Sequence, residues 1–346
     1  MIFLKILLFP FTIIYTGITI CRNKMYDLGF FTSEQVPVAV ICVGNLKAGG
    51  TGKTPFTQYL VNTYSNTYKT AVLSRGYGRK TKGFVLAGVD STIHDIGDES
   101  FQIYSHANNN YVVAVCEDRV QGVKELLNLY PDLKLVILDD GFQHRKIKRD
   151  VNVLLTEYND PFYADWVLPS GRLRECKISA ARADVVVVTK TPSTYKPLSH
   201  QGFLPYIKPR VPVHYTGISY GSYHTSIDIQ PLKNKVIVVT GIANAIPVLT
   251  YLKELNLDVV KHFNFSDHYA FTSKDINLVE EVCKSYDSVQ IITTEKDWVK
   301  IVPLLKEVKS STMWGYIPIE LTVYSNEHAL LDLVQQKIDK RLYSLS

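Results

Sequence analysis

A glycine-rich segment, VGNLKAGGTGKTP, carries the clearest chemical signal in the sequence. It follows a continuous β-branched run at 36–43, typical of a buried strand, and precedes a helix predicted from about Lys53 to Tyr64. Glycines allow backbone N–H groups to turn around phosphate oxygens, Lys53 would reach the terminal phosphates, and Thr54 would hold Mg²⁺. The first glycine of the usual phosphate-loop pattern is replaced by Lys47. The predicted nucleotide-binding residues are Lys47, Ala48, Gly49, Gly50, Thr51, Gly52, Lys53 and Thr54.

A second signal is LVILDDGFQH, in which four apolar residues end in Asp139 and Asp140. Parallel α/β sheets bind ligands at the carboxyl ends of their strands. A carboxylate at that edge would bind Mg²⁺ or its water, as the second acidic motif of such NTPases does. The alternative is a solvated acidic turn. Next to a phosphate loop, the magnesium interpretation is favoured.

Two loops could supply a base for an alcohol acceptor. IGDES places Asp98 after a glycine, and FSDHYAF places Asp267 and His268 before a helix with a predicted N-cap at Thr272. Asp98 and His268 lie in different halves of the chain, so spacing alone does not bring them together. By composition alone, each is more often a structural loop residue.

Basic residues recur in several loops, where guanidinium groups could stabilise a transferring phosphoryl group. They are Arg75, Arg79, Lys80, Lys82, Arg119, the run His144 to Arg149, Arg172 and Arg174. They are not interleaved with aromatic residues on one element, which argues against a nucleic-acid surface. The net charge of +5 is mild and fits nucleotides or lipid phosphates.

The elements that would position these residues alternate between buried strands and helices. This predicts an α/β fold, a P-loop NTPase parallel sheet with helices on both faces. A proline-rich stretch at 191–234 separates it from a second alternating unit. The predicted organisation is an apolar helix at 1–30, a P-loop catalytic domain at 31–210, a short β-hairpin linker at 211–233, and a smaller α/β domain at 234–346. A strand at 317–324 and a final helix near 326–340 would complete that second domain.

The N-terminal segment carries no charge between Lys5 and Arg22. It lacks the small-residue cleavage site of a secretory signal, and Pro10 interrupts it. A helix lying in the membrane interface is favoured over a true span or a buried core helix. Arg22 and Lys24 follow it and favour a cytoplasmic location for the rest of the chain. Five scattered cysteines without a C-x-x-C pair argue for a reducing compartment.

In combination, these motifs resemble the lipid A 4'-kinase (tetraacyldisaccharide 4'-kinase) family. The matching runs are VGNLKAGGTGKTP, LSRGYGRK, GDE, EDR, LDDGFQHRKIKRD, LPSGRLRE, DH and TEKD, in the family's order from about residue 40 to 297. The resemblance implies two α/β/α domains with the active site between them. It also implies transfer of the ATP γ-phosphate to the 4'-hydroxyl of an acylated glucosamine disaccharide 1-phosphate at the cytoplasmic face of the inner membrane.

The resemblance also assigns roles to individual residues. Asp98 would be the base toward the sugar hydroxyl, supported by His268. Lys53 and Thr54 would contact phosphate and magnesium, and Asp139 with Asp140 would be the paired aspartates. The remaining matched positions are Glu175 near the metal and phosphates, and Arg119, Gln143 and Arg174 as polar active-site residues. The implied cofactors are ATP and Mg²⁺, and no nucleic-acid partner is expected.

The rival prediction is a membrane-associated GTPase or regulatory P-loop NTPase. The run VVVVTKTP at 185–192 superficially resembles a strand followed by the guanine-binding [NT]KxD motif. The aspartate position is Pro192, which removes the carboxylate that would accept hydrogen bonds from guanine. A nucleic-acid or interaction module on the same fold is a weaker rival, since fold alone does not fix function.

Overall fold

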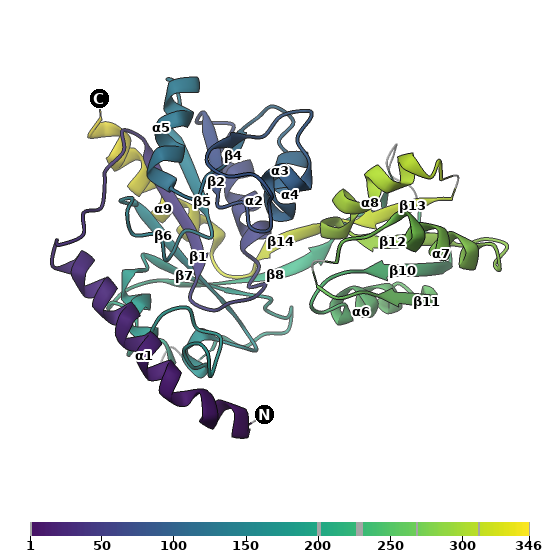
Figure 1. Ribbon diagram of the computed structural model, residues 1–346, viewed down its shortest axis with the longest axis horizontal. Coiled ribbons are helices and arrows are strands. Elements are labelled where there is room, and N and C mark those ends of the chain that lie inside the picture. Colours follow the sequence, from purple (N-terminus) through teal and green to yellow (C-terminus); the bar gives the residue numbers. More distant parts are fainter. Residues whose placement is uncertain (1, 199–201, 226–230, 268, 311, 346) are drawn as a thin grey trace.

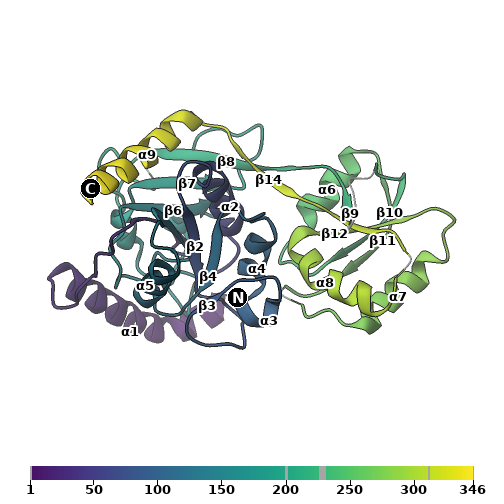
Figure 2. The ribbon, with the colours of Figure 1, turned by 90° about the horizontal axis from the view of Figure 1, so that it is seen from above.

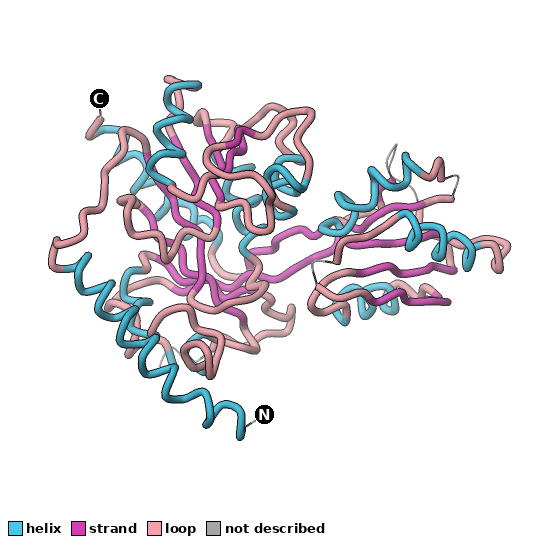
Figure 3. Tube along the Cα trace, viewed as in Figure 1, coloured by secondary structure: helices cyan, strands magenta, loops and turns pink. Residues whose placement is uncertain are grey.

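The computed structural model describes residues 2–198, 202–225, 231–267, 269–310 and 312–345. Two α/β domains lie side by side, and a long N-terminal helix runs along the larger one (Figure 1). We call the larger unit the first domain and the smaller unit the second domain. The tube view shows a sheet at the centre of each domain, with helices packed around it (Figure 3). The α/β fold class and the parallel sheet with helices on both faces are therefore confirmed.

The first domain is built on a nine-stranded sheet. In spatial order its strands are β14 (Ile319–Val323), β8 (Val213–Tyr220), β7 (Val185–Thr189), β6 (Val151–Glu157), β1 (Ala39–Asn45), β5 (Leu135–Asp139), β2 (Thr70–Ser74), β4 (Val112–Val115) and β3 (Val85–Leu86). The seven strands from β8 to β4 are parallel, and the two edge strands are antiparallel. β1 and β5 are neighbours, so the ends of the two motif-bearing strands meet at one sheet edge.

Helices and loops cover both faces of this sheet. One face packs against α2 (Lys53–Tyr64), α4 (Asp98–Ser105) and α9 (Glu327–Tyr343), with Phe56, Ile103 and Val334 in the core. The other face packs against α5 (Arg119–Leu129) and the segment 158–207, which carries the 3₁₀ turns η1 (Phe162–Ala164) and η2 (Lys177–Arg182). The short α3 (Ile93–Ile96) leads into α4. Because both faces are covered, the strands read as continuous apolar runs.

The second domain has a five-stranded sheet. Its strands in order are β11 (Asp258–Asn264), β10 (Lys235–Thr240), β12 (Gln290–Thr294), β13 (Trp314–Ile317) and β9 (His224–Thr225). Its helices are α6 (Ile246–Glu254), α7 (Ser273–Cys283) and α8 (Glu295–Glu307). α6 packs on one face, and α7 with α8 packs on the other. The sequence reasoning missed α8, which also packs against α4 of the first domain (Figure 2).

The connection between the domains differs from the predicted hairpin at 211–233. β8 pairs with β14, close to the C-terminus, and not with β9. Pro318 divides the single strand predicted at 317–324, because its missing N–H interrupts the ladder: β13 lies in one sheet and β14 in the other. The chain then returns to the first domain, where α9 packs on β1 and β6. Residues 319–343 therefore belong with the first sheet and not with the predicted unit 234–346.

The N-terminal helix α1 (Ile2–Asp27) has two different faces. Its polar side chains Thr12, Thr19 and Asn23 are buried against the first domain. Its exposed apolar side chains are Ile6, Leu7, Phe9, Phe11, Ile13, Ile14 and Ile18. By length and composition, Ile6–Asp27 would suffice to cross a membrane. An apolar face that points to solvent on a docked helix is consistent with membrane association.

Candidate active site

The loop between β1 and α2 has the backbone that a phosphate loop requires. Gly49 has φ 119° and Gly52 has φ 77°, both in the region that favours glycine. Gly52 is also the N-cap of α2, which begins at Lys53 as the sequence predicted. The N–H groups of the first helical turn therefore open toward this loop, and they favour an anion there.

Neighbouring segments hold this loop in place. The Lys47 ammonium, almost fully buried, pairs with Asp160 and lies 3.1 Å from an Asp165 oxygen. The Ala48 N–H donates to the Arg172 carbonyl at 2.8 Å, and the Thr189 hydroxyl donates to the Thr51 carbonyl at 2.9 Å. Lys47 therefore supports the loop through its side chain. Thr189, which belongs to the run VVVVTKTP, also supports the phosphate loop, through its hydrogen bond to Thr51.

Lys53, Asp139 and Asp140 come together at the carboxyl edge of the sheet. Asp139 ends β5 and is in register with Val43 of β1. The Lys53 Nζ lies 3.8 Å from an Asp140 oxygen. The Thr57 hydroxyl donates to Asp139 at 3.0 Å, a contact that the sequence reasoning missed. The signal was the i, i+4 spacing of Lys53 and Thr57, which places them on the same side of α2.

The pKa values of the two aspartates are shifted in opposite directions. Burial raises the pKa of Asp139 to about 7, and the charges of Glu99 and Asp140 add to that rise. Burial also acts on Asp140, but Lys53 and Arg174 outweigh it and lower the pKa of that carboxyl. Arg174 donates to both Asp140 oxygens, at 2.9 and 2.8 Å. Asp140 is thus a firmly ionised carboxylate, and a cation beside Asp139 would favour the ionised form there also.

The predicted metal set of Thr54, Asp139 and Glu175 stays a prediction. Thr54 lines a separate cavity between α2 and the strands β13 and β14. Glu175 is 1% exposed and is bound by Arg182 at 2.5 Å, with Arg22 at 3.7 Å. Within the described ranges, no three His, Cys, Asp or Glu side chains form a metal cluster. Mg²⁺ usually takes one or two carboxylates and completes its shell with phosphate oxygens and water. The Asp139–Asp140 pair fits that requirement.

A cavity of about 560 Å³ opens above these aspartates. It is lined by Tyr15, Thr19 and Arg22 of α1, Ser74 to Tyr77, Gly97, Glu99, Ser100, Glu117, Arg119, Asp139, Asp140, Gln143, His144 and Arg174. Arg119 is 2% exposed, and its Nε has no hydrogen-bond partner among the described residues. Burial lowers the pKa of this guanidinium. A buried cation with an open donor in a cavity suits an anionic ligand.

Asp98 lies beside this cavity at the junction of the two domains. Gly97 and Glu99, on either side of it, line the cavity. A side chain at Gly97 would meet the Tyr77 carbonyl at 2.6 Å, so glycine lets the two loops approach closely. An Asp98 oxygen lies 3.4 Å from Lys300 Nζ on α8 of the second domain. His268 lies outside the described residues, so the Asp98–His268 pairing stays a prediction.

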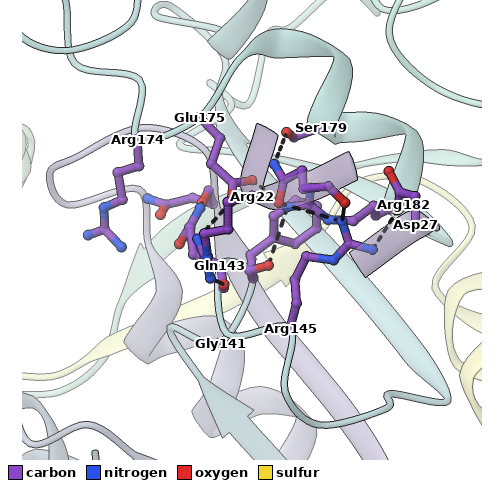
Figure 4. A network of polar contacts seen from close by, with 12 residues as sticks. Arg22, Asp27, Gly141, Gln143, Arg145, Arg174, Glu175, Ser179 and Arg182 are labelled. Atoms are coloured by element: carbon purple, nitrogen blue, oxygen red, sulfur yellow. Dashed lines mark hydrogen bonds and ion pairs between the residues drawn. The ribbon is translucent and has the colours of Figure 1, made fainter. Parts of the chain in front are cut away.

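Side chains of α1 reach the loops that frame the cavity (Figure 4). Arg22 donates to the Gln143 carbonyl at 2.6 Å and lies near Glu175. The Gln143 side chain in turn donates to the Asn45 carbonyl, at the start of the phosphate loop, at 2.7 Å. The Tyr15 hydroxyl donates to the Arg174 carbonyl at 3.0 Å. The apolar helix is therefore part of the wall of the site.

Comparison with known proteins identifies the family. The family model described as LpxK, tetraacyldisaccharide-1-P 4'-kinase, matches residues 4–339. The chain belongs to this family. A tetraacyldisaccharide 4'-kinase of Cytophaga hutchinsonii is 56% identical, with 100% of this chain and 99% of that protein covered. The corresponding protein of Flavobacterium psychrophilum is 38% identical, over 98% of this chain and 96% of its own length.

A solved structure supports the same assignment. The chain is similar to LpxK from Aquifex aeolicus in complex with ATP, with a TM-score of 0.78 and 28% identity. The match covers 97% of this chain and 99% of that one. As a member of the tetraacyldisaccharide 4'-kinase family, the chain is an ATP-dependent kinase. This decides against the GTPase and interaction-module alternatives.

Proposed function

We propose that this kinase transfers the γ-phosphate of ATP to the 4'-hydroxyl of a tetraacyldisaccharide 1-phosphate, a step of lipid A biosynthesis. The observation that carries the proposal is one cavity with two aspartates at its floor and a membrane-type helix in its wall. Lys53 of the phosphate loop lies 3.8 Å from one of these aspartates, Asp140. A nucleotide alone does not require that helix. An acylated sugar phosphate does, since its acyl chains stay in the bilayer.

The nucleotide side of the reaction is carried by the first domain. Backbone N–H groups of residues 47–54 bind the β- and γ-phosphates, and Lys53 stabilises the charge that develops during transfer. Asp139 and Asp140 would hold Mg²⁺, which would neutralise part of the phosphate charge. Thr57 orients Asp139 through its hydroxyl. Arg119 and Arg174 line the same cavity, where they offset the negative charge of the transferring group.

The acceptor side depends on Asp98. A carboxylate at the edge of the cavity is suited to orient the sugar 4'-hydroxyl and accept its proton as the new P–O bond forms. His268 supports Asp98 in this proposal. The residues on either side of position 268 contact α8. The Lys296 Nζ lies 3.2 Å from an Asp267 oxygen, and the Lys300 Nζ lies 3.5 Å from the Tyr269 carbonyl oxygen.

The decisive experiment uses the purified protein with ATP, Mg²⁺ and a tetraacyldisaccharide 1-phosphate, followed by mass measurement of the lipid. We expect the lipid to gain one phosphate. Asp98→Ala should lower kcat by about 10²–10⁴-fold while ATP still binds. Asp90→Ala changes an exposed loop aspartate and should have no effect. An unmodified lipid would refute the substrate, and unchanged turnover of Asp98→Ala would refute the base.

The exposed face of α1 supports a location at the cytoplasmic face of the inner membrane. Replacing Ile14 and Ile18 by Glu places charges on that face and leaves the buried Thr12, Thr19 and Asn23 contacts intact. The double variant should float less with lipid vesicles than the unmodified protein, since charges are costly in an apolar phase. Equal flotation of both proteins would contradict membrane binding through α1.

A further inference from the structure

Lys300 is a buried cation at the junction of the two domains. Its side chain is 5% exposed, and its Nζ lies 3.4 Å from an oxygen of Asp98, which is itself 12% exposed. The pair joins α8 of the second domain to α4 of the first. Burying a charge pair is costly and is seldom the most stable choice for an interface. We therefore look to function, and not to stability, to explain why Lys300 and Asp98 are paired at this buried junction.

The face of α8 that carries Lys300 touches two parts of the acceptor side. Lys296 lies one turn earlier on that face and pairs with Asp267. Lys300 reaches the carbonyl of Tyr269 at 3.5 Å as well as Asp98. One face of α8 thus contacts both Asp98, the proposed base, and the loop that carries Asp267 and Tyr269.

The start of α8 is itself firmly fixed. Asp297 is fully buried; it accepts the Gly241 N–H at 2.8 Å and the Thr294 hydroxyl at 2.7 Å. These bonds tie the first turn of α8 to the ends of β10 and β12. Glu295 also accepts a hydrogen bond from Gln102 of α4 at 3.0 Å. Lys300 therefore projects from a rigid element, as a residue that sets the position of another side chain should.

We propose that Lys300 is a positioning residue of the phosphoryl transfer. Its ammonium keeps the Asp98 carboxylate ionised and oriented, and it does so when the second domain is packed against α4. An opposite charge at this distance favours the ionised form of a carboxylate. The orientation of the Asp98 carboxylate thus depends on how the second domain packs against α4. This proposal rests on Asp98 acting as the base in the proposed function.

The test compares three lysine variants with the unmodified protein. Lys300→Met should lower kcat by about 10–100-fold and leave the KM for ATP unchanged. Lys300→Arg keeps the charge and should recover most of the lost rate. Lys306→Met removes an exposed lysine from the last turn of the same helix and should have no effect. Full kcat in Lys300→Met, or an Arg variant no better than Met, would overturn the proposal.

A double variant distinguishes the proposed role of Lys300 from the proposed role of Asp98 as the base. If Lys300 acts through Asp98, Lys300→Met should cost nothing further in the Asp98→Ala background. Losses that multiply would show that Lys300 acts elsewhere. Full activity of Asp98→Ala alone would instead refute the base assignment, whatever Lys300 does. If Lys300→Met does not fold, Lys300→Gln replaces it with the same expected results, since it also lacks the charge.

Discussion

The two domains share a strand–turn–helix arrangement but differ in the residues of the turn. In each, an early parallel strand runs into a turn and then a helix: β1 into α2, and β10 into α6. The first turn has two glycines with positive φ and is followed by Lys53. The second turn, Gly241 to Ala245, contains no basic residue. The shared fold provides a sheet edge, and residue type decides which edge binds phosphate.

The second domain contributes through a different element. Its charged side chains at the junction come from α8, which follows β12 and packs against α4. Lys300 and Glu295 both reach across to the first domain. The comparison teaches that the phosphate donor is held within one domain, whereas the proposed base is held by both. Variants on each side of the junction should therefore behave differently.

Between the two matched turns, the larger effect is expected at Lys53. Lys53→Ala should lower kcat by about 10²–10³-fold, because it removes a charge aimed at the phosphates. Lys253→Ala, in the last turn of α6, is the matched change in the second domain and should leave the rate unchanged. Steady-state kinetics with varied ATP measures both. An equal loss of kcat in the two variants would contradict the conclusion that only the first domain binds the phosphates.

A smaller effect is expected at the glycines near the ends of β1 and β10. A Cβ at Gly44 would meet Cβ and backbone N of Phe142 at 2.7 and 2.8 Å. Gly44→Ala should therefore cost about 1–3 kcal/mol of unfolding free energy in a urea titration. The atoms nearest to a Cβ at Gly241 belong to the side chains of Asp297 and Phe271, at 3.1 and 3.2 Å. Gly241→Ala should cost less, and the reverse order would contradict this packing argument.

The smallest expected effect concerns pH and the junction. His106 of α4 lies 2.8 Å from Glu295 of α8, and that carboxylate raises the pKa of His106. A raised pKa stabilises the folded state most below pH about 6.5, and the gain disappears as pH rises through the folded-state value. The His106 side chain is 36% exposed, so solvent screens the pair and about 0.5 kcal/mol is expected.

His106→Gln measures this contribution. The difference in unfolding free energy between the variant and the unmodified protein should be greatest near pH 5.5 and should shrink toward zero near pH 8.5. A difference that grows with pH would mean that His106 stabilises the junction in its neutral form.

Local signals in the sequence were sufficient for much of the first domain. The strand before the phosphate loop, the start of α2 at Lys53 and the aspartates at the end of β5 all follow from apolar runs and glycine placement. These features depend on neighbours in the chain. The family resemblance then supplied the kinase activity, which no single motif could.

Long-range contacts could not be predicted in the same way. Pairing of β8 with β14 joins residues about a hundred positions apart, and nothing local in either strand identifies its partner. The run TEKD is both a matched family motif and the capped first turn of α8, so the motif match alone does not predict this helix. The contact of Lys300 with Asp98 depends on that helix, so it was missed as well. Glu175 matched a family position, yet its charge is taken up by Arg22 and Arg182.

The pairing of β8 with β14 has a consequence for how such a protein is assembled. Tyr220 is opposite Ile319, and the Gly221 N–H donates to the Pro318 carbonyl at 3.0 Å, so the chain leaves and re-enters the large sheet at one point. Residues 221–318 therefore form a module whose two ends nearly touch. A short turn in its place would close a hairpin and leave a self-contained nucleotide-binding protein. An acceptor-side domain could be added to such a protein at one point, without a change in the strand order of its sheet.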